Sequence, residues 1–277
     1  MTFTTLTYLL FLPLTFGLYW SIRSRAGQNL LIVAASYVFY GWWDWRFAAL
    51  MLASSVTDYA LGAAIDRAPS ARRRKLFLVL SCLVNFGLLG FFKYFNFFIH
   101  NLKAALDAAG WHQDIATLEV ILPVGISFYT FQSFSYTVDI YRGKLKPANS
   151  LVEFVAFVSF FPQLVAGPIE RATNLLPQFA ADRRFDPAAA TDGLRQMLWG
   201  FVKKLAVADR LAVVVNDVYA DPSSKNGPAL AAATVFFAFQ IYCDFSAYSD
   251  IAVGSARLFG FRLMRNFALP YFSRSLT

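Results

Sequence analysis

Five stretches of this chain are apolar over most of the length that a helix needs to cross a lipid bilayer. About 20 apolar residues in a helix span the hydrocarbon core. The stretches are 6–20, 30–43, 47–65, 76–99 and 118–138. Their apolar residues do not alternate as barrel strands require, so we predict helices, which satisfy their backbone hydrogen bonds internally. The sequence therefore predicts an all-α, polytopic membrane protein.

The composition fits the same class. Hydrophobic residues make up 57% of the chain and charged residues 15%, whereas charged residues form about 25% of a typical soluble domain. No long linker separates the apolar stretches. We therefore expect residues 1–277 to form a single transmembrane domain surrounded by membrane lipid.

Loops rich in basic residues alternate with loops that are poor in them. Arg23 and Arg25 follow the first stretch, the cluster 72–75 follows the third, and residues 142–146 follow the fifth. Cytoplasmic loops carry an excess of Lys and Arg, so the pattern places the amino terminus outside and these loops in the cytoplasm. The net charge of +8 then comes from basic cytoplasmic loops that set the topology and lie near anionic lipid. We therefore predict no nucleic-acid partner.

The second half of the chain is less regular. Residues 151–169 are apolar but contain Pro162, Gly167 and Pro168, which interrupt helical hydrogen bonding. Non-helical backbone at membrane depth needs protein or water around it, so we predict a re-entrant segment there. We expect the polar stretch 174–192 to lie at the cytoplasmic surface.

Two helical segments follow. Residues 193–218 have a helical pattern whose apolar face is interrupted by charges, among them Lys203 and Lys204. This segment either crosses the membrane among other helices or lies flat in the interface. Residues 229–258 are apolar again, and the arginines that follow them place their end inside.

Two carboxylates, Asp244 and Asp250, lie within the last apolar stretch. A charge near the middle of a membrane helix costs about 2.5–3.5 kcal/mol on insertion scales, so such residues usually face a polar interior. Asp244 and Tyr248 are four residues apart and share a helical face, while Asp250 is rotated away. We predict that all three residues line a polar pathway, with Asp244 and Tyr248 as the better candidate pair. Hydrogen bonds that hold helices together are the alternative.

Three blocks of sequence resemble those of a known family. They are LPVGISFYTFQSFSYTVDIYRG at 122–143, FVSFFPQLVAGPIER at 157–171 and QIYCDFSAYSDIAVGSARLFGF at 240–261. They are similar to blocks of the bacterial membrane-bound O-acyltransferases, in the branch of the alginate O-acetylation membrane protein. The similarity extends from FYGWWDWRF at 39–47 to PYFSRS at 270–275, nearly the whole chain.

The resemblance implies a ring of tilted helices around a funnel in the bacterial inner membrane. An acetyl group from a cytosolic thioester donor, acetyl-CoA in the alginate branch, would reach hydroxyls of an exported polysaccharide such as alginate. The acetyl group would pass to an exported acetyltransferase partner that modifies the polysaccharide, and polysaccharide-export proteins would be further partners. The donor is a substrate, and the resemblance implies no bound cofactor.

The resemblance also suggests where substrates bind. Ser127, Tyr129 and Gln132 can hydrogen-bond the thioester or the pantetheine chain of the donor, with helix packing as the alternative. A proposed donor-binding loop contains a Pro/Gly break beside an arginine, which exposes backbone donors to an anion such as a nucleotide phosphate. Its residues are Gly167, Pro168, Glu170 and Arg171. An ordinary turn with an exposed Glu-Arg pair is equally compatible with this sequence.

The family's catalytic histidine follows the PYFSRS-like segment in a Trp-His motif, and this chain stops at Thr277 before it. His100 and His112 lie in a predicted exterior loop and match no family histidine. We therefore expect no catalytic residue within these residues and no activity from them alone, because a hydroxyl needs a general base. The two His and two Cys residues show no metal-site spacing. A catalytically inactive scaffold of the export machinery and a transporter or channel are the alternative functions.

Overall fold

The computed structural model describes residues 1–111, 120–164, 167–168, 170–268 and 270–275 of the chain. The described residues form helices and no strands, which confirms the all-α prediction. The α-helices are α1 (Leu6–Ser21), α2 (Arg25–Gly41), α3 (Trp45–Arg67), α4 (Ala71–Ala108), α5 (Ile126–Tyr141), α6 (Leu151–Ser159), α7 (Phe161–Leu164), α8 (Ala172–Ala180), α9 (Pro187–Phe201), α10 (Asp209–Ala220) and α11 (Gly227–Leu258). Shorter elements are the π-helix η1 (Val202–Ala208) and the 3-10 helices η2 (Pro222–Ser224) and η3 (Pro270–Phe272).

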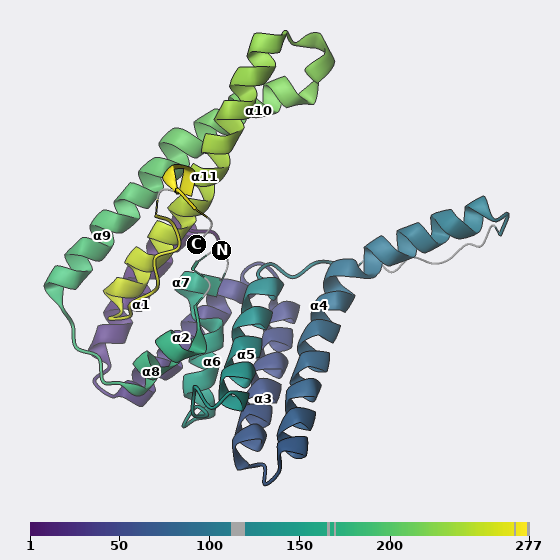
Figure 1. The fold of residues 1–277 in the computed structure, drawn as a ribbon. Coiled ribbons are helices and arrows are strands. Elements are labelled where there is room, and N and C mark those ends of the chain that lie inside the picture. Colours follow the sequence, from purple (N-terminus) through teal and green to yellow (C-terminus); the bar gives the residue numbers. More distant parts are fainter. Residues whose placement is uncertain (112–119, 165–166, 169, 269, 276–277) are drawn as a thin grey trace.

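Among the described residues, three helices are long and apolar enough to cross a membrane, namely α3, α4 and α11. The apolar α1 is shorter. Helix α4 exceeds its predicted range at both ends: it has 38 residues and is therefore about 57 Å long. Its last part projects away from the other helices (Figure 1) and carries His100, which is exposed. His112 lies outside the described residues.

The helices form two groups that meet at a shared core (Figure 1). Helices α3, α4 and α5 pack together in one group. In the other, α9, η1 and α10 follow one another without a break and run beside α11 as a long hairpin. Residues 193–218 therefore form a helix as predicted, antiparallel to α11 in this hairpin.

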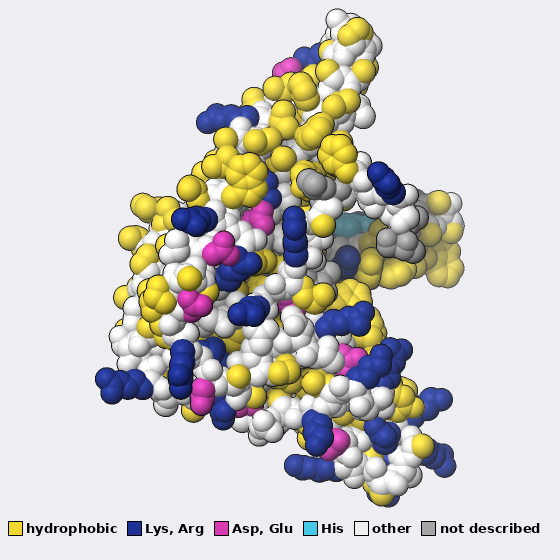
Figure 2. Space-filling model, turned by 60° about the vertical axis from the view of Figure 1, so that its left-hand side comes forward, with side chains coloured by type: hydrophobic (Ala, Val, Ile, Leu, Met, Phe, Trp, Pro, Cys, Tyr) yellow, Lys and Arg dark blue, Asp and Glu magenta, His cyan; other side chains and the backbone are white. Residues whose placement is uncertain are grey.

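The surface pattern separates the two ends of the molecule. Figure 2 shows hydrophobic side chains over the hairpin at the top and most of the basic side chains over the lower half. The loops after α3 and α5, both predicted to be cytoplasmic, lie at the lower end of Figure 1, away from the amino terminus. The orientation of these ends relative to the membrane stays a prediction.

Within the segment predicted to be re-entrant, residues 151–164 form two short helices, α6 and α7. Nine residues give α6 a length of about 13 Å, too short to cross a membrane alone. The chain breaks between the helices at Phe160, which has an extended ψ of 104°. The predicted break at Pro162 is therefore wrong in position. Proline is tolerated in the first turn of α7, where a helix does not need its N–H.

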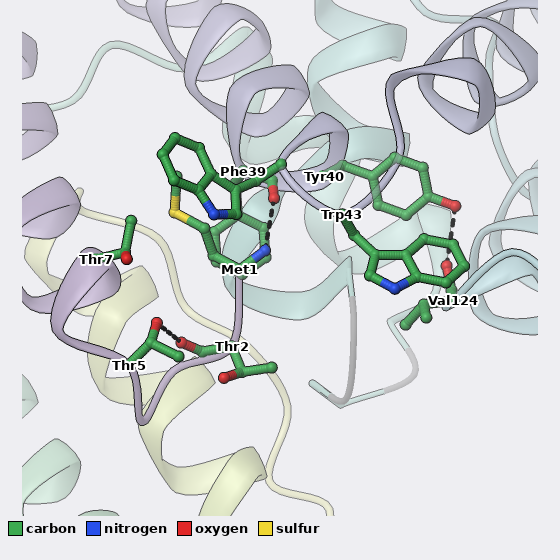
Figure 3. A pocket seen from close by; sticks show the side chains of 9 residues that line it. Met1, Thr2, Thr5, Thr7, Phe39, Tyr40, Trp43 and Val124 are labelled. Atoms are coloured by element: carbon green, nitrogen blue, oxygen red, sulfur yellow. Dashed lines mark hydrogen bonds between the residues drawn. The ribbon is translucent and has the colours of Figure 1, made fainter.

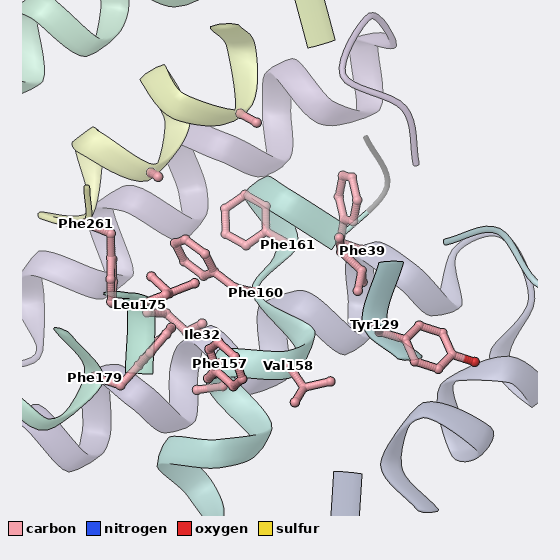
Figure 4. Packing of buried hydrophobic residues seen from close by; sticks show 14 of the residues in the cluster. Ile32, Phe39, Tyr129, Phe157, Val158, Phe160, Phe161, Leu175, Phe179 and Phe261 are labelled. Carbon is pink, nitrogen blue, oxygen red and sulfur yellow. The ribbon is translucent and has the colours of Figure 1, made fainter. Parts of the chain in front are cut away.

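The core forms where α2, α6, α7 and α8 meet the end of α11. Phe160 packs against Phe179 and Phe261, with ring centroids 5.5 and 4.8 Å apart (Figure 4). Phe179 belongs to α8, whose Leu175 and Leu176 are also buried. The expectation that 174–192 forms a polar surface segment is therefore wrong for α8, because leucine and phenylalanine on one helical face drive its burial.

One glycine is required where α5 begins. Gly125 has a φ of 75°, in the left-handed region, and a Cβ there would lie 2.7 Å from the carbonyl oxygen of Leu164. Any larger residue would be strained in its backbone and would push α7 away. This contact fixes the start of α5, which carries three of the predicted site residues, against the core.

Candidate functional site

Two adjacent lysines of η1 face two carboxylates of α11 inside the long hairpin. The Nζ of Lys203 lies 2.5 Å from Oδ2 of Asp250, and the Nζ of Lys204 lies 2.6 Å from Oδ1 of Asp244. Lys204 also pairs with Asp209 at 2.8 Å. Each of the two carboxylates within the last apolar stretch therefore has a cation beside it.

The π-helix explains how neighbouring lysines reach the same helix. Successive residues of an α-helix point about 100° apart, whereas the wider turns of a π-helix rotate less for each residue. Lys203 and Lys204 both lie in η1, so both side chains can reach α11. Single π-turns inside α-helices are frequent at functional sites.

Glycines let the two helices approach closely at this point. A Cβ on Gly193 would lie 2.7 Å from the carbonyl oxygen of Gly254, and one on Gly200 would lie 2.8 Å from that of Ala247. Small residues at helix interfaces allow such contact between backbones in membrane proteins. The glycines thus set the distance that the lysine side chains must bridge.

A pocket of about 430 Å³, the hairpin pocket, lies between α9, η1 and α11 beside the Lys203–Asp250 pair. Lys203 also donates to Oγ of Ser246 at 2.9 Å, and Nε2 of Gln196 donates to Oδ1 of Asp250 at 2.9 Å. Oε1 of Gln196 is buried and has no hydrogen-bond partner among the described residues. Arg265 also lines the pocket. A volume of a few hundred Å³ with a small number of convergent polar groups is typical of a ligand site.

The predicted pair of Asp244 and Tyr248 lies next to this pocket without lining it. Both contact Lys204, whose Nζ lies 5.5 Å from the centre of the Tyr248 ring. The Asp244 side chain is 45% exposed, and the Tyr248 ring packs against Phe3 with a centroid distance of 6.0 Å. Asp250, which helical spacing rotates away from them, lines the pocket instead. That Asp244 and Tyr248 line a substrate path stays a prediction.

The candidates on α5 lie away from the hairpin pocket. Gln132 is buried and donates from Nε2 to the carbonyl oxygen of Phe157 at 2.8 Å, a bond that joins α5 to α6. Tyr129 is buried and packs against Tyr40 with a ring distance of 6.5 Å. Ser127 is half-buried. Their proposed contacts with a donor stay predictions, and Gln132 already has a structural role.

A second pocket, of about 400 Å³, lies where the amino terminus meets the end of α2 (Figure 3). The amino group of Met1 donates to the carbonyl oxygen of Phe39 at 3.0 Å. The hydroxyl of Tyr40 donates to the carbonyl oxygen of Val124 at 2.9 Å. The Trp43 ring forms part of its wall. This pocket presents hydroxyl and aromatic groups and no carboxylate.

The proposed donor-binding loop is tied to the chain after α11. The carboxylate of Glu170 is buried and accepts hydrogen bonds from the backbone N–H of Met264 and from Asn174, the latter at 2.7 Å. Burial raises the pKa of Glu170 above its usual value, although these two hydrogen bonds oppose the change. The N–H of Gly167 donates to Gln163 at 3.0 Å and is not free for an anion. Pro168 is buried and Arg171 is exposed, and donor binding by this loop stays a prediction.

The sequence profile of the membrane-bound O-acyltransferase family matches residues 144–274, which include η1, α11 and the pocket between them. Residues 144–274 belong to the membrane-bound O-acyltransferase family. The match contains the two later blocks of the resemblance and confirms it. Together with the apolar helices, membership identifies a multi-pass membrane protein.

Relatives extend this similarity over the whole chain. The chain is 40% identical to the probable alginate O-acetylase AlgI of Pseudomonas syringae pv. tomato, with 100% of the chain and 53% of that relative covered. It is 41% identical to the probable alginate O-acetylase AlgI of Azotobacter vinelandii, with 100% of the chain and 55% of that relative covered. The peptidoglycan O-acetyltransferase of Helicobacter pylori is 30% identical, with 97% and 56% covered. The chain thus spans about half the length of these relatives.

A buried carboxylate on α3 was not singled out from the sequence. Asp58 is fully buried and accepts hydrogen bonds from Ser81 at 2.7 Å and from Nδ2 of Asn85 at 2.9 and 2.8 Å. Thr137 of α5 lies 3.0 Å from the Ser81 hydroxyl. The reasoning that drew attention to Asp244, a carboxylate within an apolar stretch, applies equally to Asp58. The described residues contain no group of three His, Cys, Asp or Glu that could hold a metal ion.

Proposed function

We propose that this chain is part of an inner-membrane O-acyltransferase that moves an acetyl group from a cytosolic thioester such as acetyl-CoA toward an exported polysaccharide such as alginate. The observation that carries the proposal is the 40% identity to alginate O-acetylase over the entire chain. The teichoic acid D-alanyltransferase of Streptococcus thermophilus is 26% identical over 55% of the chain. The names of these relatives agree on acyl transfer and differ in the polymer, so acyl transfer is the better-supported part of the proposal.

The hairpin pocket supports the same proposal. Lys203 and Asp250 place a neutralised ion pair at the edge of a cavity, and Gln196 offers a free acceptor oxygen. Such groups can bind the carbonyl and amide groups of a thioester donor. Both carboxylate oxygens of Asp250 are already engaged, one by Lys203 and the other by Gln196. We propose that the general base comes from the part of the relatives' length that this chain does not span.

The lysine partners account for one of the two features behind the transporter alternative. That alternative rested on intramembrane carboxylates and on broken helices. Both Asp244 and Asp250 have lysine partners on the neighbouring helix. An exported acetyltransferase partner remains part of our proposal because an acetyl group on the far side of the membrane needs an acceptor there.

The test is acetyl transfer by the full-length protein in vesicles that contain the exported partner and labelled acetyl-CoA. We expect Asp244→Asn to lower transfer several-fold more than it lowers the amount of protein in the membrane. Asp217→Asn is the matched control, since Asp217 is an exposed carboxylate of the same hairpin paired with Lys225. Equal losses in transfer and accumulation would show a structural role for Asp244.

The 277-residue form provides the second arm of this experiment. We expect it to transfer no acetyl group above background under the same conditions, because it lacks the proposed base. Turnover by this form would contradict that assignment. Absence of transfer by the full-length protein with its partner and donor would contradict the proposed function.

A further inference from the structure

We infer that a pocket lined by three arginines, beside the end of α11, binds a phosphate group. This arginine pocket has a volume of about 550 Å³ and lies between the loop 181–186, the start of α9 and residues 260–263. Arg184, Arg257 and Arg262 line it together with Asp186 and Asp192. It is separate from the hairpin pocket and from the proposed donor-binding loop.

The charges in the arginine pocket do not cancel locally. Asp186 caps α9 and accepts hydrogen bonds from the N–H groups of Ala188 and Ala189 at 2.9 and 3.2 Å. Asp192 pairs with the guanidinium of Arg257. Both carboxylates are therefore engaged. The guanidinium groups of Arg184 and Arg262 have no carboxylate within salt-bridge distance among the described residues, and they leave the pocket positive.

The backbone around these two arginines is held in place. Gln178 accepts from the N–H of Arg262 at 2.8 Å and donates to its carbonyl oxygen at 2.9 Å. Arg183, the neighbour of Arg184, donates to Asn29 at 2.6 Å and stacks on the Phe261 ring at 4.8 Å. A site whose backbone is fixed before binding loses less entropy when a ligand binds.

Guanidinium groups bind phosphate oxygens through paired N–H donors, which makes arginine well suited to phosphate recognition. The phosphate can belong to the nucleotide part of the donor, an assignment that rests on the proposed function, or to a phospholipid headgroup. Arg257 follows Asp250 by seven residues on α11, which is about 10 Å along the helix axis. A donor held here by its phosphates could extend its thioester arm toward the hairpin pocket.

The test compares the full-length protein with its Arg184→Gln/Arg262→Gln variant, using coenzyme A as the probe and pantetheine as the probe without phosphate. We expect the Kd for coenzyme A to rise about tenfold or more, because hydrogen bonds between charged groups are lost. Binding of pantetheine should be unchanged. The matched control is Arg72→Gln/Arg73→Gln, which removes two exposed arginines from the first turn of α4 and should leave both Kd values unchanged.

A second experiment, with lipid, distinguishes the two sources of phosphate. The full-length protein and its Arg184→Gln/Arg262→Gln variant are purified from vesicles containing phosphatidylglycerol, and the retained lipid is measured by mass spectrometry. Loss of lipid with unchanged coenzyme A binding would support the pocket and assign it to a headgroup. Unchanged coenzyme A binding together with unchanged lipid retention would overturn the inference. Because neither arm requires acetyl transfer, failure of the proposed function is distinguishable from failure of this site.

Discussion

The bundle of α3, α4 and α5 and the hairpin of α9 to α11 both contain carboxylates in apolar helices, and they accommodate them differently. In the bundle, Asp58 is fully buried among the neutral side chains of Ser81 and Asn85. In the hairpin, Asp250 is 25% exposed, pairs with Lys203 and borders a pocket. A carboxylate in an apolar stretch is therefore not by itself the mark of a functional site.

The difference shows what each region can do. Hydrogen bonds around Asp58 join α3 and α4, and Thr137 adds α5, so this cluster fixes a packing arrangement. The donors of Ser81 and Asn85 are engaged by Asp58, and the cluster lies apart from the three pockets described above. The hairpin keeps its charges beside open volume, where a ligand can reach them. The same residue type therefore stabilises helix packing in one group and offers polar contacts in the other.

The largest expected effect comes from removing the carboxylate in the bundle. Asp58→Ala removes the buried carboxylate that accepts from the amide of Asn85 and from the hydroxyl of Ser81, and we expect the free energy of unfolding to fall by about 3 kcal/mol. Asp58→Asn keeps an acceptor oxygen and the side-chain size, so it should cost about 1 kcal/mol or less. Unfolding of the detergent-solubilised protein measures both. If Asp58→Asn lowered the free energy of unfolding as much as Asp58→Ala, the charge of Asp58 would be needed for stability. The bundle and the hairpin would then not differ in their need for a charged carboxylate.

An intermediate effect is expected for the pair beside the pocket. Lys203→Met leaves Asp250 without its cation, and we expect a loss of about 2 kcal/mol, below the value for fully buried pairs because Asp250 is partly exposed. Adding Asp250→Asn removes the stranded charge and should restore about half of that loss. The double-mutant cycle is measured by the same unfolding experiment. Additive losses would mean that the two side chains do not interact, although Nζ of Lys203 lies 2.5 Å from Oδ2 of Asp250 in the structure.

The smallest effect is expected at the more exposed pair. Lys204→Gln should lower the free energy of unfolding by about 0.5 kcal/mol, because Asp244 is half exposed and water screens the interaction. Salt at about 1 M should reduce this difference further, while the effect of Asp58→Ala should hardly change. Unfolding at low and high salt provides the measurement. A loss as large as that of Lys203→Met would show that both lysines lie in equally dry surroundings.

The helical class and the two helical segments of the hairpin could be predicted from sequence, because apolar stretches near the thickness of a bilayer allow few folds. The Lys203–Asp250 contact could not, since it depends on η1 and on glycine contacts between helices distant in sequence. The break at Phe160 was missed because proline was taken as the interruption, whereas Pro162 fits within the first turn of α7. The partners of Asp58 on α4 and α5 could not be predicted, because only the packing of three helices brings them together.

The π-helix makes the number of residues between α9 and α10 as important as their chemistry. Its wide turn contains one residue more than a regular helix would need for the same advance. Deleting one residue from 202–208 would let the segment return to an α-helix, and one of the two lysines would then turn away from α11. Relatives that keep both pairs should therefore vary in side chains along this segment more readily than in its length.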